Sequence, residues 1–160
     1  MDKLKIFLYL VIVILGASCG SKPTTETSTA PAEAQSMVKD ASSYDPSRGE
    51  GKWTADMLKI GEAVDATMAE SGGKIQSVKC SSCHKLTDEK LVGPGWKGVT
   101  TRRTGEWIMN FITNPDPMID KDPEVQAQLE ICLVRMPNQN LTDDEARHVL
   151  EYMRQNDSAK

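Results

Sequence analysis

The sequence predicts an all-α fold over residues 51–160. Apolar residues recur there at spacings of three and four, which is the period of amphipathic helices. Two of these runs open with helix-capping patterns. No stretch alternates between apolar and polar residues as a half-buried strand does. We therefore expect a small helical domain without a sheet.

The first two helices are expected in the N-terminal part of this domain. The first runs from about Thr54 to Glu70 and is expected to end at Ser71-Gly72-Gly73. The second is short and runs from about Lys74 to Cys83. The apolar face of the first helix comprises Met57, Ile60, Gly61, Val64 and Met68.

Three further helices follow. The third begins at Thr104 and ends before Asn114-Pro115. The fourth begins with Asp122-Pro123, an N-cap followed by proline at the first helical position. The fifth runs from Thr142 to about Gln155 and opens with the capping box Thr142-Asp143-Asp144-Glu145. The inward residues are Trp107, Ile108, Phe111 and Ile112 in the third, Val125, Leu129 and Cys132 in the fourth, and Ala146, Val149, Leu150 and Met153 in the fifth.

The sequence Cys80-Ser81-Ser82-Cys83-His84 has the form C-x-x-C-H, the attachment site of a c-type haem. Two thiols at this spacing can form thioether bonds to one porphyrin, and the adjacent imidazole becomes an axial ligand of the iron. A thioredoxin-like site would need a βαβ setting, and a structural zinc site would need four ligands. We therefore expect one covalent haem c, attached through Cys80 and Cys83 and ligated by His84.

The charge of the chain disfavours nucleic acid as a partner. It has 19 basic and 23 acidic residues, a net charge of −4 and a pI of about 5.2. This balance fits a small soluble protein that docks on basic patches of other proteins.

Residues 1–18 are expected to be a signal peptide. Lys3 and Lys5 precede an apolar run, Ile6–Leu15, which is shorter than the ~20 residues that span a bilayer. The run ends in Leu15-Gly16-Ala17-Ser18-Cys19, which resembles the lipobox of bacterial lipoproteins, although Leu15 lies four residues before Cys19 instead of three. The resemblance implies a lipidated Cys19 at the mature N-terminus and a membrane-anchored protein at the periplasmic or cell-surface side of a bacterium. Ordinary cleavage near Ser18, leaving a free Cys19, is the alternative.

Residues 19–50 are expected to be a disordered tether between the lipid and the haem domain at residues 51–160. From residue 20 to about 47 the sequence is rich in Ser, Thr, Pro, Ala and Glu and almost free of apolar residues. Such a segment cannot bury enough surface to become ordered. With Cys19, Cys80 and Cys83 assigned, Cys132 is left alone, and we expect it to be a buried small hydrophobe.

The sixth ligand of the iron decides what the haem can do. The second histidine, His148, lies in a charged run and is expected at the surface. Met136 precedes Pro137 and lies shortly before the capped start of the last helix, 52 residues beyond His84. We expect Met136 to be the ligand, with Met118, which lies between Pro117 and Ile119, as the competitor.

Residues 55 to 155 resemble class I cytochromes c. Gly72 and Gln76 stand eight and four residues before Cys80, where the family has a glycine and commonly an aromatic residue against the last helix. The polar Gln76 departs from this pattern, so Ile75 or Val78 is expected to take over that packing against Leu150 or Tyr152. The resemblance also implies that the carbonyl of Pro94 orients His84, that Met136 is the axial thioether, and that Arg102, Arg103 and Trp107 meet the propionates.

This resemblance implies a one-electron carrier of a respiratory chain and not an enzyme. We expect it to pass electrons from a quinol-oxidising complex to a terminal oxidase or reductase, with an N-oxide reductase as one such acceptor. Two alternatives stay open: a haem enzyme or gas sensor with an open iron, and a fixed cytochrome subunit of a larger oxidoreductase.

Overall fold

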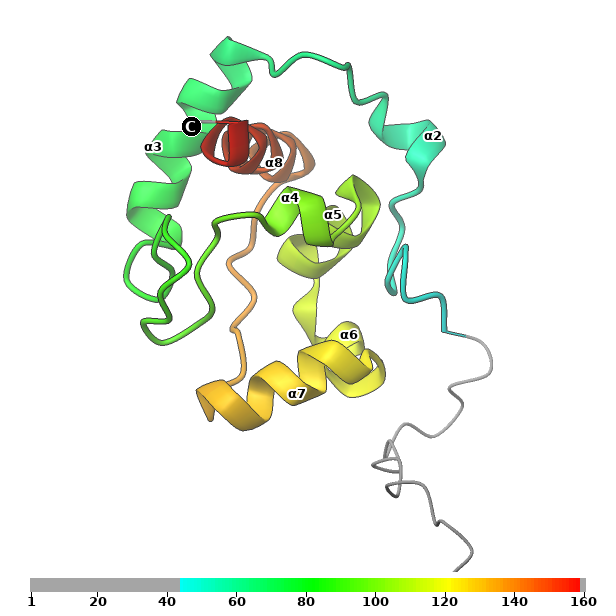
Figure 1. Ribbon diagram of the computed structural model, residues 1–160. Helices are drawn as coiled ribbons and strands as arrows, with labels where there is room; N and C mark the ends of the chain where they lie inside the picture. The colour runs from blue at the N-terminus through cyan, green and yellow to red at the C-terminus, as the bar shows by residue number, and fades with distance from the viewer. Residues whose placement is uncertain (1–43, 159–160) are drawn as a thin grey trace, which may run out of the picture. The chain divides into compact units, whose positions relative to one another are not determined.

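The computed structural model describes residues 44–158, and every regular element in this range is a helix (Figure 1). The prediction of an all-α fold is confirmed for this part of the chain. The signal peptide, Cys19 and the tether as far as residue 43 lie outside the described residues. No helix between residues 44 and 158 is both long and apolar enough to cross a membrane. The helices are α2 (Ala55–Leu58), α3 (Ala66–Lys79), α4 (Val99–Arg102), α5 (Gly105–Thr113), α6 (Pro115–Lys121), α7 (Pro123–Cys132) and α8 (Asp143–Ser158).

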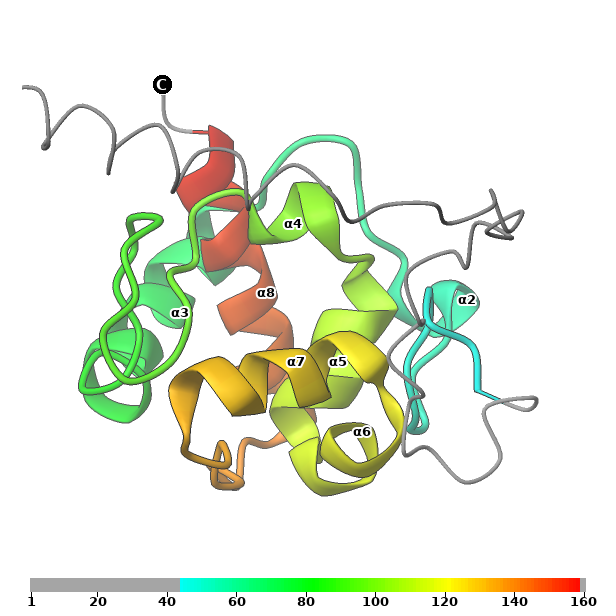
Figure 2. The ribbon, with the colours of Figure 1, turned by 60° about the horizontal axis from the view of Figure 1, so that its bottom comes forward.

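Helices α3 and α8 cross where glycine lets their backbones touch (Figures 1 and 2). A Cβ atom on Gly72 would lie 2.1 Å from the carbonyl oxygen of His148, so no larger residue fits without movement of the backbone. One residue on, the ring of Tyr152 packs against Gly73, whose added Cβ would lie 3.0 Å from Cε2 of that ring. The crossing that the resemblance implied is therefore present, and Tyr152 contributes to it together with the backbone of His148.

The prediction of one long first helix from about Thr54 to Glu70 is wrong. Helix α2 ends at Leu58, because Lys59 adopts a left-handed conformation with φ of 44°. Helix α3 starts only at Ala66, where the carboxylate of Asp65 accepts hydrogen bonds from two amides of its first turn at 2.9 Å. The helix then continues through Gly72-Gly73 instead of stopping there. Packing against α8 offsets the ~1 kcal/mol that each glycine costs in a helix interior.

Two predicted helices between α3 and α8 are confirmed, and two short ones were not predicted. The hydroxyl of Thr104 accepts a hydrogen bond from the amide of Trp107, and the carboxylate of Asp122 accepts two from the first turn of α7. Helix α4 has only four residues, too few to show a periodic pattern. Helix α6 begins with Pro115, which we expected to follow a helix end, but proline suits the first helical position equally well.

The packed domain includes residues that precede the predicted boundary at residue 51. Gly49 is buried, and a Cβ atom on it would lie 2.5 Å from Cε of Met118. The hydroxyl of Tyr44 donates to the buried carboxylate of Asp122, which also accepts a hydrogen bond from Nε1 of Trp107 at 2.9 Å. Burial and the hydrogen bond to Asp122 both raise the pKa of Tyr44.

The predicted capping box and apolar face of α8 are confirmed. The hydroxyl of Thr142 accepts from the amide of Glu145 at 3.2 Å, and the carboxylate of Glu145 accepts from the amide of Thr142 at 2.9 Å. Helix α8 thereby has a fixed start directly after the segment that carries Met136. Its core-facing residues are all at most 3% exposed: Ala146, Val149, Leu150 and Met153.

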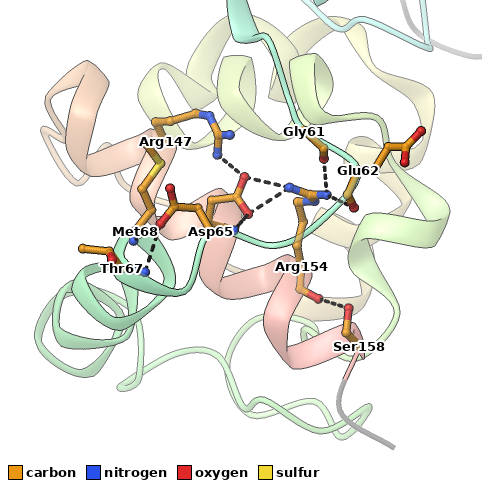
Figure 3. Close-up of polar contacts among 9 residues, drawn as sticks. Gly61, Glu62, Asp65, Thr67, Met68, Arg147, Arg154 and Ser158 are labelled. Atoms are coloured by element: carbon orange, nitrogen blue, oxygen red, sulfur yellow. Dashed lines mark hydrogen bonds and ion pairs between the residues drawn. The ribbon is translucent and has the colours of Figure 1, made fainter.

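A buried carboxylate on α8 joins this helix to the connection between α2 and α3 (Figure 3). Glu151 is only 1% exposed, and its carboxylate lies 2.6 Å from Arg147 and 2.8 Å from Arg154. It also accepts a hydrogen bond from the amide of Asp65 at 3.2 Å. Arg154 in turn donates to the carbonyl groups of Gly61 and Glu62. These bonds hold the N-terminal end of α3 in place, which the sequence pattern did not indicate.

Candidate haem site

The C-x-x-C-H residues lie in a tight turn directly after α3. The helix ends at Lys79, and the amides of Cys83 and His84 both donate to the carbonyl of Cys80, at 3.0 and 2.9 Å. The expectation of a helix as far as Cys83 is therefore wrong, because the chain leaves the helical conformation at Cys80. Cys80 is buried and Cys83 is half-buried, and neither forms a disulfide. Before haem is attached, burial raises the pKa of the Cys80 thiol to about 11.

The imidazole of His84 is oriented by the backbone of the next loop. Its Nδ1 lies 2.8 Å from the carbonyl oxygen of Pro94, and a carbonyl can only accept, so Nδ1 carries the proton. That tautomer leaves the lone pair of Nε2 available to a metal ion. Burial lowers the pKa of His84, which favours the neutral ring that metal ligation requires.

The loop between His84 and Trp96, which we call the His84 loop, packs closely around the imidazole. A Cβ atom on Gly93 would lie 2.4 Å from Cε1 of His84, so the backbone at Gly93 touches the ring. The amide of Gly93 donates to the carbonyl of Cys83 at 2.9 Å. The ring of Trp96, at the end of the loop, is buried, and its centroid lies 5.8 Å from that of His84. These contacts limit rotation of the imidazole.

The residues of this site fit a covalently bound haem. They supply two thiols two residues apart and an imidazole with the correct tautomer, which is the donor set of a c-type haem. Nearby segments also expose an unusual number of large apolar side chains, which is typical of surface that a ligand or a partner covers. They are Leu91, Val92, Ile131, Leu133 and Val134, between 37% and 83% exposed.

Met136 lies on the chain between α7 and α8, residues 133–141, which we call the Met136 segment. Two lysines connect this part of the chain with the haem-attachment motif. Nζ of Lys90 donates to the carbonyl of Ile131 at 3.1 Å, and Nζ of Lys79 lies 3.5 Å from the carbonyl of Gln139. The half-buried Met136 thus lies between two points of attachment, Ile131 at the end of α7 and Gln139, which are bonded to Lys90 and Lys79 respectively.

Met118, the competing ligand candidate, is packed in the core. It lies in α6 and not in a loop, and it is fully buried. A Cβ atom added to Gly49 would lie 2.9 Å from Sδ and 2.5 Å from Cε of Met118. The thioether of Met118 is therefore already enclosed by protein.

The remaining residues of the predicted α3–α8 contact are only partly as expected. Gln76 is buried, at 6% exposed, and its carbonyl accepts from the amides of Cys80 and Ser81. Ile75 packs against the core, whereas Val78 is 81% exposed and cannot take that role. His148, expected at the surface, is half-buried because its backbone lies against Gly72.

The three residues expected near the propionates have protein partners in this structure. Arg103 stacks 4.5 Å above the ring of Trp107 and pairs with Glu124. Nε1 of Trp107 donates to Asp122, and Arg102 donates to the carbonyl of Lys97 at 2.7 Å. Cys132, expected to be buried, is half-buried.

The sequence pattern did not indicate the roles of Gly93, Lys79 and Lys90. Gly93 directly precedes Pro94, and the adjacent pair is the only local signal for a close approach to His84. The two lysines give no such signal, because their acceptors lie 60 and 41 residues further along the chain.

With this fold and this histidine environment, the chain is a class I c-type cytochrome. The family model described as cytochrome c matches residues 69–157, from α3 to α8. The chain belongs to the cytochrome c family, whose members are haem electron carriers, and it binds haem c covalently.

Solved structures support the same assignment. Cytochrome c from Rhodothermus marinus is 32% identical, with a TM-score of 0.64 over 72% of this chain and 95% of that chain. An engineered form of it, Rma TDE, has a TM-score of 0.62 over 71% of this chain and 98% of that chain, also at 32% identity. The same engineered protein bound to a carbene intermediate has a TM-score of 0.60 at 32% identity, with the same coverage. No curated protein matches the chain significantly.

Proposed function

We propose that this cytochrome is a one-electron carrier whose iron is bound by His84 and Met136. The observation that carries the proposal is the connection of the Met136 segment to the residues around the haem motif, through Lys79 and Lys90. The burial of Met118 against Gly49 also supports Met136 over Met118 as the ligand. An iron whose axial positions are both filled by protein side chains has no vacancy for a substrate, so electron exchange is the chemistry that remains.

The bound haem supplies the reversible exchange between Fe(III) and Fe(II), and the chain keeps its surroundings constant. The carbonyl of Pro94 fixes the tautomer and direction of His84, which makes the imidazole a better donor. A thioether is a soft ligand that favours the reduced ion, so Met136 raises the reduction potential. Ligands held in one position in both oxidation states keep the reorganisation on electron transfer small.

The proposed partners are redox proteins of a respiratory chain. We propose that electrons arrive from a quinol-oxidising complex and leave to a terminal oxidase or reductase, with an N-oxide reductase as one candidate acceptor. Two properties support a protein partner: the exposed apolar side chains on the His84 loop and around the end of α7, and the net charge of −4, which suits basic surfaces.

We further propose that lipidated Cys19 anchors the protein to a membrane at the periplasmic or cell-surface side. Because Tyr44 already packs in the haem domain, the tether that we propose is limited to residues 20–43, and a coil of that length has a typical end-to-end distance of about 27 Å, enough for the haem domain to reach membrane-bound partners. Cys19→Ala should release the protein from the membrane fraction, whereas Cys132→Ala should leave it there. Equal membrane retention of both variants would show that another anchor is present.

The ligand assignment is tested by replacing each of the two methionines. Met136→Ala should abolish the methionine–iron charge-transfer band, lower the midpoint potential and let carbon monoxide bind the reduced protein. Met118→Ala should reduce the free energy of unfolding by about 2–5 kcal/mol, the cost of a core cavity, and leave the spectrum of the folded protein unchanged. Loss of the charge-transfer band in Met118→Ala, with the band kept in Met136→Ala, would show that Met118 is the ligand of the iron.

The alternative function is that of a haem enzyme or gas sensor with an open iron. The engineered cytochrome c from Rhodothermus marinus that is bound to a carbene intermediate is the observation that justifies testing it. A wild-type protein that binds carbon monoxide as readily as Met136→Ala would favour this alternative.

A further inference from the structure

We propose that Lys90 is a positioning residue that holds the Met136 segment in place relative to His84. The inference rests on the proposed ligation of the iron by His84 and Met136. Lys90 is connected to both ligand-bearing parts of the chain, to one through its backbone and to the other through its side chain.

The backbone of Lys90 is paired with that of His84. The two residues form an isolated antiparallel bridge, the only one within residues 44–158. Lys90 therefore lies directly beside His84, inside the loop that Gly93 and Pro94 hold against the imidazole. A displacement of the Lys90 backbone would therefore also displace the His84 loop.

The side chain of Lys90 reaches the C-terminal end of α7. Its ammonium group donates to the carbonyl of Ile131 at 3.1 Å. This carbonyl lies in the last turn of the helix, where backbone oxygens have no partner within the helix and carry partial negative charge. Helix α7 has no basic residue of its own in that turn, so Lys90 provides the cation from another part of the chain.

The contact lies where a small movement would displace Met136. Leu133, in the left-handed conformation, ends α7 and turns the chain into the Met136 segment. Arg135, next to Met136, pairs with Asp116 and Asp120 of α6, at 3.3 and 3.1 Å. Arg135 thus anchors the segment to α6, and Lys90 is the anchor that connects it with His84. Without Lys90, the end of α7 can move away from the His84 loop, and the bond between Met136 and the iron opens more often.

The test is the competition between imidazole and Met136 in the oxidised, haem-loaded protein. Imidazole binds the iron only when the methionine has left, so its apparent affinity reports how often the Met136 segment opens. Lys90→Met keeps the aliphatic chain but removes the donor, Lys90→Arg keeps a donor, and Lys74→Met removes a comparable exposed lysine from α3. We expect Lys90→Met to bind imidazole about two- to fivefold more tightly than wild type, as the loss of one solvent-exposed hydrogen bond predicts. The imidazole affinity of Lys90→Arg should remain close to that of wild type. The imidazole affinity of Lys74→Met should equal that of wild type.

Three outcomes would overturn the inference. Equal imidazole affinity in Lys90→Met and wild type would show that the contact does not hold the segment. A raised affinity that Lys90→Arg does not restore would show that the hydrogen bond is not the cause. If the wild-type protein itself lacks the methionine–iron band, the proposed ligation fails, and the inference fails with it. The band in wild type therefore separates the two kinds of failure.

Discussion

The backbone of Gly93 is in contact with the imidazole of His84. A Cβ atom at Gly93 would lie 2.4 Å from Cε1 and 2.9 Å from Nδ1 of the ring. Nδ1 is also the atom that donates to the carbonyl of Pro94. One dipeptide, Gly93-Pro94, thus sets both the position and the orientation of the proximal ligand.

Gly93→Ala should therefore disturb the haem site. The added methyl group must displace the imidazole, and we expect a loss of about 1–3 kcal/mol in the free energy of unfolding, as for other overpacked sites. The midpoint potential should change as well, because the hydrogen bond to Pro94 is strained. Chemical denaturation and a redox titration measure the two effects. Gly61→Ala is the control, since its Cβ would meet only a carbonyl oxygen at 3.7 Å. Equal stability and equal midpoint potential in the two variants would contradict the contact between Gly93 and His84.

Gly72→Ala should weaken the crossing of α3 and α8. The new Cβ would lie 2.1 Å from the backbone oxygen of His148, and a backbone cannot move aside as a side chain can. We expect a loss of about 3 kcal/mol or more in the free energy of unfolding, measured by chemical denaturation.

Gly73→Ala is the matched control for this crossing. Its Cβ would meet the ring of Tyr152 at 3.0 Å, and the gain of ~1 kcal/mol in helix propensity offsets the shift of that ring. Its stability should stay within about 1 kcal/mol of wild type. A Gly72→Ala protein as stable as Gly73→Ala would show that the helices do not cross at Gly72.

Glu151→Gln should destabilise the protein strongly. The substitution removes the charge that compensates Arg147 and Arg154 at a position only 1% exposed. We expect a loss of about 3–5 kcal/mol in the free energy of unfolding, as when one partner of a buried ion pair is removed. Glu70→Gln breaks an exposed pair with Lys74 and should leave the stability almost unchanged, because solvent screens that pair. A small effect at Glu151 would mean that solvent reaches this cluster.

Acid should release the capping box of α8. The hydrogen bond from the Thr142 amide, and to a lesser degree Lys79, lowers the pKa of Glu145. Because the folded-state pKa lies below the reference value of 4.5 for an unperturbed Glu, the carboxylate stabilises the fold above that pH. This contribution disappears as the pH falls through the lower, folded-state value. Wild type should therefore be more stable than Glu145→Gln at pH 7, and the difference should vanish in acid. Denaturation curves at several pH values test this, and a difference that persists in acid would contradict it.

The parts of the fold that could be predicted from sequence are those specified by neighbouring residues. The capping box at Thr142 and the N-cap at Asp122 act within one helical turn, and both helices start where the sequence indicates. The C-x-x-C-H motif is equally local, and the hydrogen bond between His84 and Pro94 spans only ten residues.

The features that could not be predicted depend on contacts that are distant in sequence. Gly72-Gly73 reads as a helix stop until α8 is known to cover it. Lys59, where the expected first helix breaks, has no local sign of a left-handed conformation. The contact between Lys90 and Ile131 spans 41 residues, and no periodicity indicates it.

The central claim is that His84 and Met136 fill both axial positions of the iron. Optical spectra of the haem-loaded protein test it most directly, recorded in the oxidised and reduced forms, with and without carbon monoxide. We predict a low-spin spectrum, a methionine–iron charge-transfer band in the oxidised form and no change on addition of carbon monoxide. A high-spin spectrum that shifts with carbon monoxide would contradict the claim and show that the iron is open to a substrate.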